Sequence, residues 1–318
     1  YGIGAALLLV DVDRFRRLVD THDGAPYMAL EFLDGTPLAA RLFLPEGNPR
    51  AAVLIGAAMG VPQSYYAAFA KWLAGQGLRV ITFDYRGSGD SRPTTRHGGL
   101  RGFRADLFDW ARDYEAVIDH AHAALPDKPL YLLGHSLGGQ LPGLIGNQHK
   151  VHGLLGVGVG SGYWRHNAPQ LKRMVPFFWW VAVPLATRLF GYFPGRRLRM
   201  VGDLPRGVIL QWRRWCLNPR YSAGAEGQAV DRGYAAVRFP VHSLFITDDE
   251  MMTVQGSQTL LDLYSQAPRT LEHVAPADVS ARRIGHFGFF REQFRASLWP
   301  QALARLRGFG PTSAPPVT

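Results

Sequence analysis

Cysteine is nearly absent from this 318-residue chain, in which Cys216 is the single example. One cysteine cannot form an internal disulfide, so the sequence is not that of a disulfide-stabilised scaffold, and it is compatible with a reducing cytoplasm. No histidines, cysteines and carboxylates have the spacing of a metal site. A phosphate-binding loop and a dinucleotide-binding motif are also missing. We therefore expect a cytoplasmic protein that uses no metal and no cofactor.

The chain also lacks a hydrophobic run of about 20 residues, the length that crosses a bilayer. Residues 2–10 are apolar, but aspartates follow at positions 11 and 13. Residues 175–187 are apolar as well, but they are too few and contain two prolines. We expect no stable membrane span, and we expect an accessory helix over about residues 5–20 that packs on the main domain.

Acidic residues are in the minority, with 25 against 35 basic ones, and the net charge is +10. A basic balance raises nucleic acid as a partner, but no nucleic-acid-binding motif is present. We therefore expect no nucleic acid partner. Alternatively, the arginines hold a carboxylate or phosphate of the substrate, for example on an acyl-thioester carrier, although most should be surface charge. Those between residues 162 and 233 include Arg188, Arg196, Arg197, Arg199, Arg206, Arg213, Arg214 and Arg220.

The most informative segment is Tyr131–Gly139, where a short apolar run leads into Gly-His-Ser-Leu-Gly. A serine in Gly-x-Ser-x-Gly between a strand and a helix occupies a sharp turn, the nucleophile elbow of serine hydrolases. The backbone of this turn is strained and passes close to its neighbours, so small residues are needed on both sides of the serine. Gly134 and Gly138 meet that need, and the pattern predicts that Ser136 is a nucleophile.

A serine nucleophile needs a histidine as base and an acid that orients it, in the chain order serine, acid, histidine. His286 lies between glycines, after a predicted strand and before a predicted helix, where a loop can carry it to Ser136. His273 also follows the acid but falls within a predicted strand, so we favour His286 as the base. His135 belongs to the elbow and should pack beside the nucleophile.

The acid should come from Asp248, Asp249 or Glu250, directly after a predicted buried strand. Residues 249–253 fit the usual pattern of an aspartate, any residue, two apolar residues and a turn-forming residue, so we favour Asp249. Asp248 is the alternative, and Glu250 is a distant third. The aspartate that does not serve the histidine should be a solvated turn residue or should cap the helix that begins near Val254.

A further motif, Asp84–Ser91, has the pattern Asp-x-Arg-Gly-x-Gly-x-Ser. Together with the elbow and the predicted serine, acid and histidine, it makes the chain resemble the α/β-hydrolases over about residues 27–308. Within that superfamily it is similar to bacterial hydrolases of the serine-aminopeptidase-like group. The resemblance implies an α/β fold, with a mostly parallel sheet flanked by helices and a helical cap inserted over the active site.

The oxyanion hole of this fold uses two backbone N–H groups, and the residue after the nucleophile, here Leu137, should supply one. The second should come from the loop Gly56–Pro62, and we predict Met59 as the donor. Many α/β-hydrolases carry His-Gly at the start of this loop, where this chain has Ala57 and Ala58. The difference concerns the second donor alone, because a backbone donor does not depend on its side chain.

Strand and helix patterns alternate as this fold requires. An antiparallel pair over residues 27–44 should turn at 34–35, a helix broken early by Pro142 should follow the elbow, and a final helix should cover 290–307. The other predicted strands cover 51–55, 78–83, 129–133, 151–160, 241–247 and 270–274, and the other predicted helices cover 64–75, 104–124 and 255–266.

These patterns divide the chain into an N-terminal accessory segment, residues 1–26, and a hydrolase core, residues 27–161 and 234–308. A cap, residues 162–233, interrupts the core, and a flexible tail rich in proline, glycine and serine covers 309–318. The cap is rich in aromatic residues. Most should bury it against the core, and a few should line an acyl pocket. Docking of the cap on a membrane surface is a weaker alternative.

The sequence thus predicts a serine hydrolase that cleaves a carboxylic ester or related acyl bond of a small molecule through an acyl-enzyme intermediate. Ser136, His286 and Asp249 would be its triad. A thioesterase, an aminopeptidase or an acyltransferase would use the same residues. A binding protein of the same fold is a weaker alternative, since it would have no need of all three. A homo-oligomer is compatible with the sequence.

Overall fold

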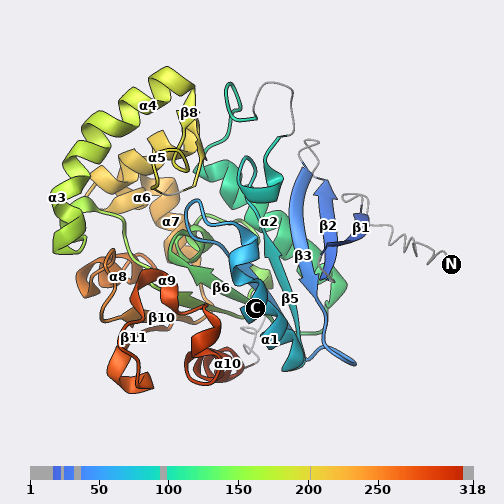
Figure 1. Cartoon of the computed structure of the whole chain (residues 1–318). Coiled ribbons are helices and arrows are strands. Elements are labelled where there is room, and N and C mark those ends of the chain that lie inside the picture. Colours follow the sequence, from blue (N-terminus) through green and yellow to red (C-terminus); the bar gives the residue numbers. More distant parts are fainter. Residues whose placement is uncertain (1–16, 23–24, 32–36, 94–98, 201, 311–318) are drawn as a thin grey trace.

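The structure is a computed structural model that describes residues 17–22, 25–31, 37–93, 99–200 and 202–310 (Figure 1). The strands of its main sheet are β1 (Arg17–His22), β2 (Ala25–Glu31), β3 (Pro37–Phe43), β4 (Ala51–Gly56), β5 (Leu78–Phe83), β6 (Leu130–His135), β7 (Gly153–Val157), β10 (Val241–Ile246) and β11 (Arg269–Val274). They form a nine-stranded sheet in the order β1-β2-β3-β5-β4-β6-β7-β10-β11. Strands β1, β2 and β3 are antiparallel to their neighbours, and all pairs from β5 to β11 are parallel.

Helices cover both faces of the sheet. In Figure 1, α1 (Ala67–Gly75) and α10 (Leu298–Gly308) lie in front of it and α2 (Leu107–Ala124) lies behind it. The rings of Phe69 in α1 and Trp299 in α10 are 5.2 Å apart, so these two helices pack against each other. The remaining α-helices of the core are α8 (Val254–Leu261) and the short α9 (Gly285–Gly288).

Central strands β4, β6 and β7 are buried along their whole length. Apart from His135 at the end of β6, their sequences are runs of apolar residues and glycine without alternation, as expected for parallel strands covered on both faces. Parallel strands end at the same edge of a sheet, so the loops that follow β4, β6, β7 and β10 meet there. This edge receives the predicted nucleophile, acid and oxyanion loop.

A second group of helices, between β7 and β10, forms a separate layer at one end of the sheet (Figure 1). A continuous helical stretch begins it, made of α3 (Pro169–Phe177), a π-helical turn over residues 178–182 and α4 (Val183–Phe190). A short antiparallel pair, β8 (Tyr192–Phe193) and β9 (Leu204–Pro205), follows. The layer ends with α5 (Arg206–Leu217), α6 (Tyr221–Glu226) and α7 (Gln228–Ala236).

The predicted α/β-hydrolase fold is confirmed, and so is the antiparallel pair near the N-terminus. The N-terminal helix is wrong where the structure tests it, because residues 17–20 belong to β1, whose backbone pairs with β2. The rest of that predicted helix, residues 5–16, lies outside the described residues, as do the turn at 34–35 and most of the predicted tail.

The helix predicted after the elbow is wrong. Two 3₁₀ turns take its place, η3 (Ser136–Gly139) and η4 (Leu141–Gly143). Pro142 cannot donate a backbone hydrogen bond. Tyrosine hydroxyls also occupy carbonyls that an α-helix would use, since Tyr264 donates to Gly139 O at 3.3 Å and Tyr234 donates to Gln140 O at 2.7 Å.

The final helix begins at Leu298 rather than at 290. Trp299 Nε1 donates a hydrogen bond to the Phe289 carbonyl at 3.0 Å, which an α-helix through 290 would need for itself. The irregular backbone over residues 289–297 buries Phe289, Phe290 and Phe294 in the core.

Asp84 in the Asp-x-Arg-Gly-x-Gly-x-Ser motif fixes the segment that leads to the site. Its buried carboxylate accepts hydrogen bonds from the backbone N–H of Gln63 at 2.8 Å and of Asp90 at 2.9 Å. Gly89 has no room for a side chain, because a Cβ there would lie 2.2 Å from the Asp84 carboxyl carbon. Gln63 begins the turn η1 (Gln63–Tyr66), so the motif anchors the residues that carry Tyr66 toward the site.

Candidate active site

Ser136 lies at the tip of the turn between β6 and η3, with a backbone φ of 51°. A left-handed backbone is strained for a residue with a side chain and persists where its surroundings enforce it. The two flanking glycines are required sterically: a Cβ on Gly138 would lie 2.0 Å from Gly56 O, and one on Gly134 would lie 2.4 Å from Gly139 N. The predicted elbow therefore has its expected geometry.

The side chains of Asp249 and His286 meet across the loops that follow β10 and β11. His286 Nδ1 lies 2.7 Å from Asp249 Oδ2, and both residues are buried. The other carboxylate oxygen, Oδ1, accepts hydrogen bonds from the N–H groups of Met251 at 2.7 Å and Met252 at 2.9 Å. These donors hold the carboxyl group in place, and its Oδ2 accepts from Nδ1 of His286, so Nε2 is the ring nitrogen that lies outside this pair.

Two further carboxylates hold the backbone of residues 284–286, which carry His286 and which we call the histidine loop. Asp248 accepts hydrogen bonds from the N–H groups of Ile284 and Gly285, each at 3.0 Å. Glu250 accepts one from the N–H of His286 at 3.0 Å. Asp248 thus binds the backbone of residues 284 and 285, while Glu250 binds the backbone of His286 and Asp249 binds its ring.

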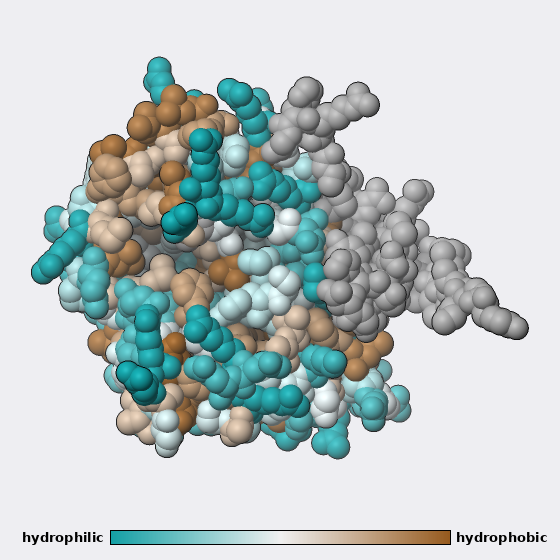
Figure 2. All heavy atoms as spheres, in the orientation of Figure 1, coloured by the Kyte–Doolittle hydropathy of each residue, from teal (hydrophilic) through white to brown (hydrophobic). Residues whose placement is uncertain are grey.

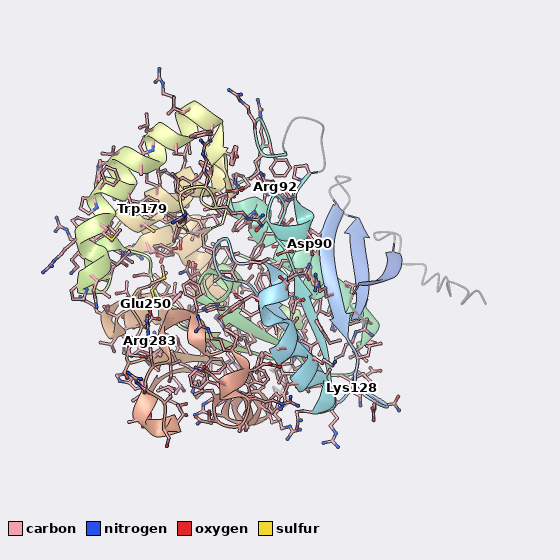
Figure 3. The ribbon with its side chains drawn as sticks, in the orientation of Figure 1. Asp90, Arg92, Lys128, Trp179, Glu250 and Arg283 are labelled. Carbon is pink, nitrogen blue, oxygen red and sulfur yellow. The ribbon has the colours of Figure 1, made fainter. Side chains whose placement is uncertain are left out.

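The side chain of Glu250 also pairs with Arg283 at 3.2 Å, as Figure 3 illustrates. Burial raises the pKa of Glu250, but hydrogen bonds from the His286 N–H and from Arg283 outweigh burial and lower it overall. The idea that the spare aspartate is solvated or caps the next helix is wrong. Asp248 binds the histidine loop, and Thr253 caps α8 by accepting from the N–H of Gly256 at 3.2 Å.

His135 links three loops of the site, although it is not placed to act as the base. It is completely buried, and its Nε2 lies 3.0 Å from the carbonyl of His286. A carbonyl can only accept, so Nε2 is protonated and Nδ1 accepts from the Tyr66 hydroxyl at 2.8 Å. The Tyr66 oxygen in turn accepts from the N–H of Ala58 at 2.9 Å. Burial lowers the pKa of His135 well below its usual value, so the ring is neutral.

This chain of hydrogen bonds joins the oxyanion loop, the elbow and the histidine loop. The neighbouring Tyr65 adds a second link, since its hydroxyl donates to the carbonyl of Phe287. The sequence predicted that His135 packs beside the nucleophile, but it did not predict the role of either tyrosine. A Tyr-Tyr pair six residues beyond Met59 has no recognisable pattern by itself, so the sequence offered no signal for it.

The two predicted oxyanion donors lie on segments that touch. Leu137 is the second residue of η3, where backbone N–H groups have no partner within the helix. Ala58 is already engaged by Tyr66, whereas nothing in the described part of the chain accepts a hydrogen bond from the Met59 N–H. The close approach of Gly56 to Gly138 brings this loop against the elbow.

The ring of His135, the residue before Ser136, lies 5.1 Å from the ring of His286. The elbow and the loop that carries His286 therefore lie side by side at the sheet edge, and no hydrogen bond to the Ser136 hydroxyl occurs among the residues described here. Gly158, with a φ of 58°, packs on the Asp249–His286 pair, and a Cβ there would lie 3.3 Å from both side chains.

A second polar cluster, missed by the sequence analysis, ties the elbow to the helices between β7 and β10. Gln140 donates from Nε2 to Gly160 O at 2.7 Å and accepts at Oε1 from the Tyr221 hydroxyl at 2.7 Å. Tyr221 is fully buried and has a φ of 53°, a strained value for an aromatic residue. These residues are far apart in sequence and belong to no common motif.

Over the described ranges, no group of three histidine, cysteine, aspartate or glutamate side chains could hold a metal ion. The same ranges include no helix long and apolar enough to cross a membrane.

Comparison with known proteins agrees with this geometry. The family model of the serine aminopeptidases, S33, matches residues 47–193. The human monoglyceride lipase is 30% identical over 135 residues, which are 42% of this chain and 43% of that lipase. A monoacylglycerol lipase of Mycolicibacterium smegmatis is 29% identical over 105 residues, 33% of this chain and 35% of that enzyme. In sequence, the chain thus matches less than half the length of these curated relatives.

Two solved structures resemble nearly the whole chain. A soluble variant of the monoglyceride lipase from Saccharomyces cerevisiae superposes with a TM-score of 0.62 at 15% identity, covering 98% of this chain and all of that one. A carboxyl esterase from Bacillus coagulans superposes with a TM-score of 0.57 at 12% identity, covering 93% and 99%. These likenesses show an α/β-hydrolase fold, and over residues 47–193 the chain is similar to the serine aminopeptidases, S33.

Proposed function

We propose that this protein is a serine hydrolase that cleaves carboxylic esters, with Ser136, His286 and Asp249 as its triad. The observation that carries the proposal is the buried 2.7 Å contact between His286 and Asp249, beside a serine held in a strained elbow. Strain of this kind concentrates at functional sites. Close packing around Gly134 and Gly138 holds the elbow, and hydrogen bonds from three carboxylates hold the histidine loop.

In the proposed mechanism, His286 Nε2 removes the proton from Ser136 Oγ as that oxygen attacks the ester carbonyl. Asp249 holds the ring and stabilises the imidazolium. The N–H groups of Leu137 and Met59 donate to the oxyanion. His286 then returns the proton to the leaving alcohol, and an acyl-enzyme remains. Water activated by the same nitrogen attacks that ester, and the acid is released with Ser136 restored.

The substrate class and the surroundings of the site are part of the proposal. The lipase relatives favour an ester of a fatty acid with glycerol. Residues 162–233 would form a cap over the core residues 27–161 and 234–308, as supported by the contact of Tyr221 with Gln140 next to the elbow. A cytoplasmic location is supported by the single cysteine, Cys216, which is buried as a free thiol.

Ester hydrolysis tests the proposal directly. Wild type, Ser136→Ala and His286→Ala are compared on p-nitrophenyl esters from acetate to palmitate, on a monoacylglycerol and on an acyl thioester. We expect hydrolysis of at least one ester by the wild type, and loss of about 10⁴-fold or more in both variants. The preferred chain length reports the depth of the acyl site.

Ser243→Ala is the matched control, because Ser243 is another buried serine and its hydroxyl has no partner among the described residues. It should keep wild-type activity. A fluorophosphonate probe provides a second readout, and it should label the wild type and the control but not Ser136→Ala. A folded wild type that neither turns over an ester nor reacts with the probe would contradict the proposal and favour a binding role.

A further inference from the structure

The helical stretch from 169 to 190 is apolar on two opposite faces. Its inner face includes Val175, Trp179 and Val183, which are buried. Its outer face is exposed but carries large apolar side chains. We define these as the outer stripe: Met174, Phe177, Trp180, Val181, Leu185 and Leu189, which are 46–66% exposed.

The outer stripe is the more exposed of the two apolar faces of this helical stretch. A surface helix normally pairs one apolar face with one polar face, and here the inner face already packs on the rest of the chain. Most of the exposed large apolar side chains in the described part of the chain lie on this one stretch, and Leu198 and Met200 follow soon after. Figure 2 shows these apolar atoms gathered where Figure 1 places α3 and α4. Exposed apolar clusters of this kind mark binding surfaces.

The charge around the stripe has a single sign. From residue 162 to residue 202 the sequence contains no aspartate or glutamate. The guanidinium of Arg197 lies 5.6 Å from the ring of Phe190, so the basic turn after β8 sits beside the C-terminal end of α4. None of the basic side chains of this segment forms an ion pair within the residues that are described. They are Arg165, Lys172, Arg173, Arg188, Arg196, Arg197 and Arg199, and all are exposed.

Charge decides between the two simplest occupants of such a surface. A second copy of the chain would bring the same positive segment against this one, which costs electrostatic energy. A bilayer that contains anionic lipids offers apolar depth and negative charge together, which is what an interfacial amphipathic helix requires. Tryptophan is enriched at that boundary, and Trp180 stands on the outer stripe.

We propose that the outer stripe docks this protein on the surface of membranes that contain anionic lipids. The helix lies in the interface with its apolar side chains among the acyl chains, while the arginines contact lipid phosphates. The docking is independent of catalysis, so it can be measured on a protein that has no activity. Its consequence for the proposed hydrolase is delivery of the cap to the surface where an acylglycerol resides.

Vesicle co-sedimentation of the Ser136→Ala protein tests the docking without turnover. Vesicles of phosphatidylcholine with 30% phosphatidylglycerol are compared with vesicles of phosphatidylcholine alone, at low and high salt. We expect binding to the anionic vesicles, at least tenfold weaker binding to the neutral ones, and weakening of the anionic binding by salt.

Two sets of variants separate the apolar and the charged contributions. Phe177→Gln with Leu185→Gln should weaken binding on the order of 100-fold, because two large side chains no longer enter the bilayer. Leu44→Gln is its control, since Leu44 is 53% exposed and Leu185 is 54% exposed, but Leu44 lies outside the stripe. Arg188→Gln should weaken binding roughly fivefold. Lys128→Gln, which Figure 3 places far from Trp179, should have no effect.

The depth of Trp180 supplies a spectroscopic readout. Brominated lipids should quench tryptophan fluorescence in the wild type, and Trp180→Phe should remove most of that quenching. The proposal is overturned if Phe177→Gln with Leu185→Gln binds as the wild type does, or if neutral and anionic vesicles bind equally. It is also overturned if the wild type sediments as a dimer that this variant dissociates, because the stripe is then an interface between copies.

Discussion

The histidine loop and the outer stripe differ in how completely the chain itself explains their residues. In the loop, backbone and side-chain groups of residues 284–286 are bound by Asp248, Asp249 and Glu250. On the outer stripe, large apolar side chains are 46–66% exposed to solvent, and Trp180 has one ring contact, with Trp164 at 6.0 Å. The hydrogen bonds of the histidine loop fix the position of His286. The exposed apolar surface of the outer stripe is instead available to a partner outside the chain.

The largest expected effect comes from breaking the internally bound region. Asp249→Asn keeps the size of the side chain but removes the charge that stabilises the imidazolium and favours the wrong ring tautomer. We expect kcat/KM to fall by about 10⁴-fold with the fold intact. Ester hydrolysis and circular dichroism measure the two quantities. Asp262→Asn is the control, because Asp262 is exposed on the surface, and it should change neither quantity. Wild-type activity of Asp249→Asn would contradict the proposed role of Asp249.

The second prediction compares the two faces of the helix through neighbouring tryptophans. Trp179 is 3% exposed and Trp180 is 49% exposed. Trp179→Ala should cost about 3–5 kcal/mol of unfolding free energy, because it leaves a cavity against the core. Trp180→Ala should change stability by less than about 0.5 kcal/mol. Urea denaturation gives both values. Equal losses would show that the outer face packs on the protein and would remove the contrast between the regions.

A smaller effect should follow from cutting the link through His135. Tyr66→Phe leaves the His135 Nδ1 and the Ala58 N–H buried without a partner, which should cost about 1–3 kcal/mol of stability. It should also lower kcat/KM about tenfold, because the oxyanion loop and the histidine loop are no longer joined by hydrogen bonds through the Tyr66 hydroxyl. Tyr85→Phe is the matched control, since that buried hydroxyl has no partner among the described residues. It should be neutral or stabilising, and similar losses in both variants would show that ring packing alone matters.

The sequence predicted the parts of this molecule that depend on local pattern. Apolar runs located the central strands, and the glycines of the elbow located Ser136, because no side chain fits where Gly134 and Gly138 lie. The pattern of residues 249–253 singled out the aspartate that contacts His286. In each case, the requirement acts between residues close in sequence or on a single position.

The parts it missed depend on partners distant in the chain. Tyr66 contacts His135 across 69 residues, and Tyr221 contacts Gln140 across 81. The helix expected after the elbow fails because Tyr234 and Tyr264 take its carbonyls, and neither tyrosine is marked by a local pattern. The outer stripe was visible as an apolar run, but the sequence could not tell its exposed face from its buried one.

The smallest expected effect is a pH dependence that His135 gives to the internally bound region. Its folded pKa lies well below the usual 6.5 because of burial, so below pH 6.5 the unfolded chain binds a proton that the folded chain does not. Stability from this residue is therefore complete above pH 6.5 and is lost as the pH falls, by up to about 1.4 kcal/mol per pH unit.

Two buried carboxyls act in the opposite direction. Burial raises the pKa of Asp84 to about 6 and that of Asp113 to about 7. Folded chains therefore bind those protons more tightly than unfolded ones, and this stabilises the fold as the pH falls. The wild-type curve mixes both effects, so the informative quantity is the difference between wild type and His135→Gln. Urea denaturation from pH 7.5 to 5 measures the unfolding free energy of both proteins. The value for wild type minus the value for His135→Gln should decrease steadily below pH 6.5. If the two proteins lose stability in parallel as the pH falls, His135 binds a proton as readily in the folded chain as in the unfolded one. The hydrogen bonds that require a neutral His135 ring would then be wrong.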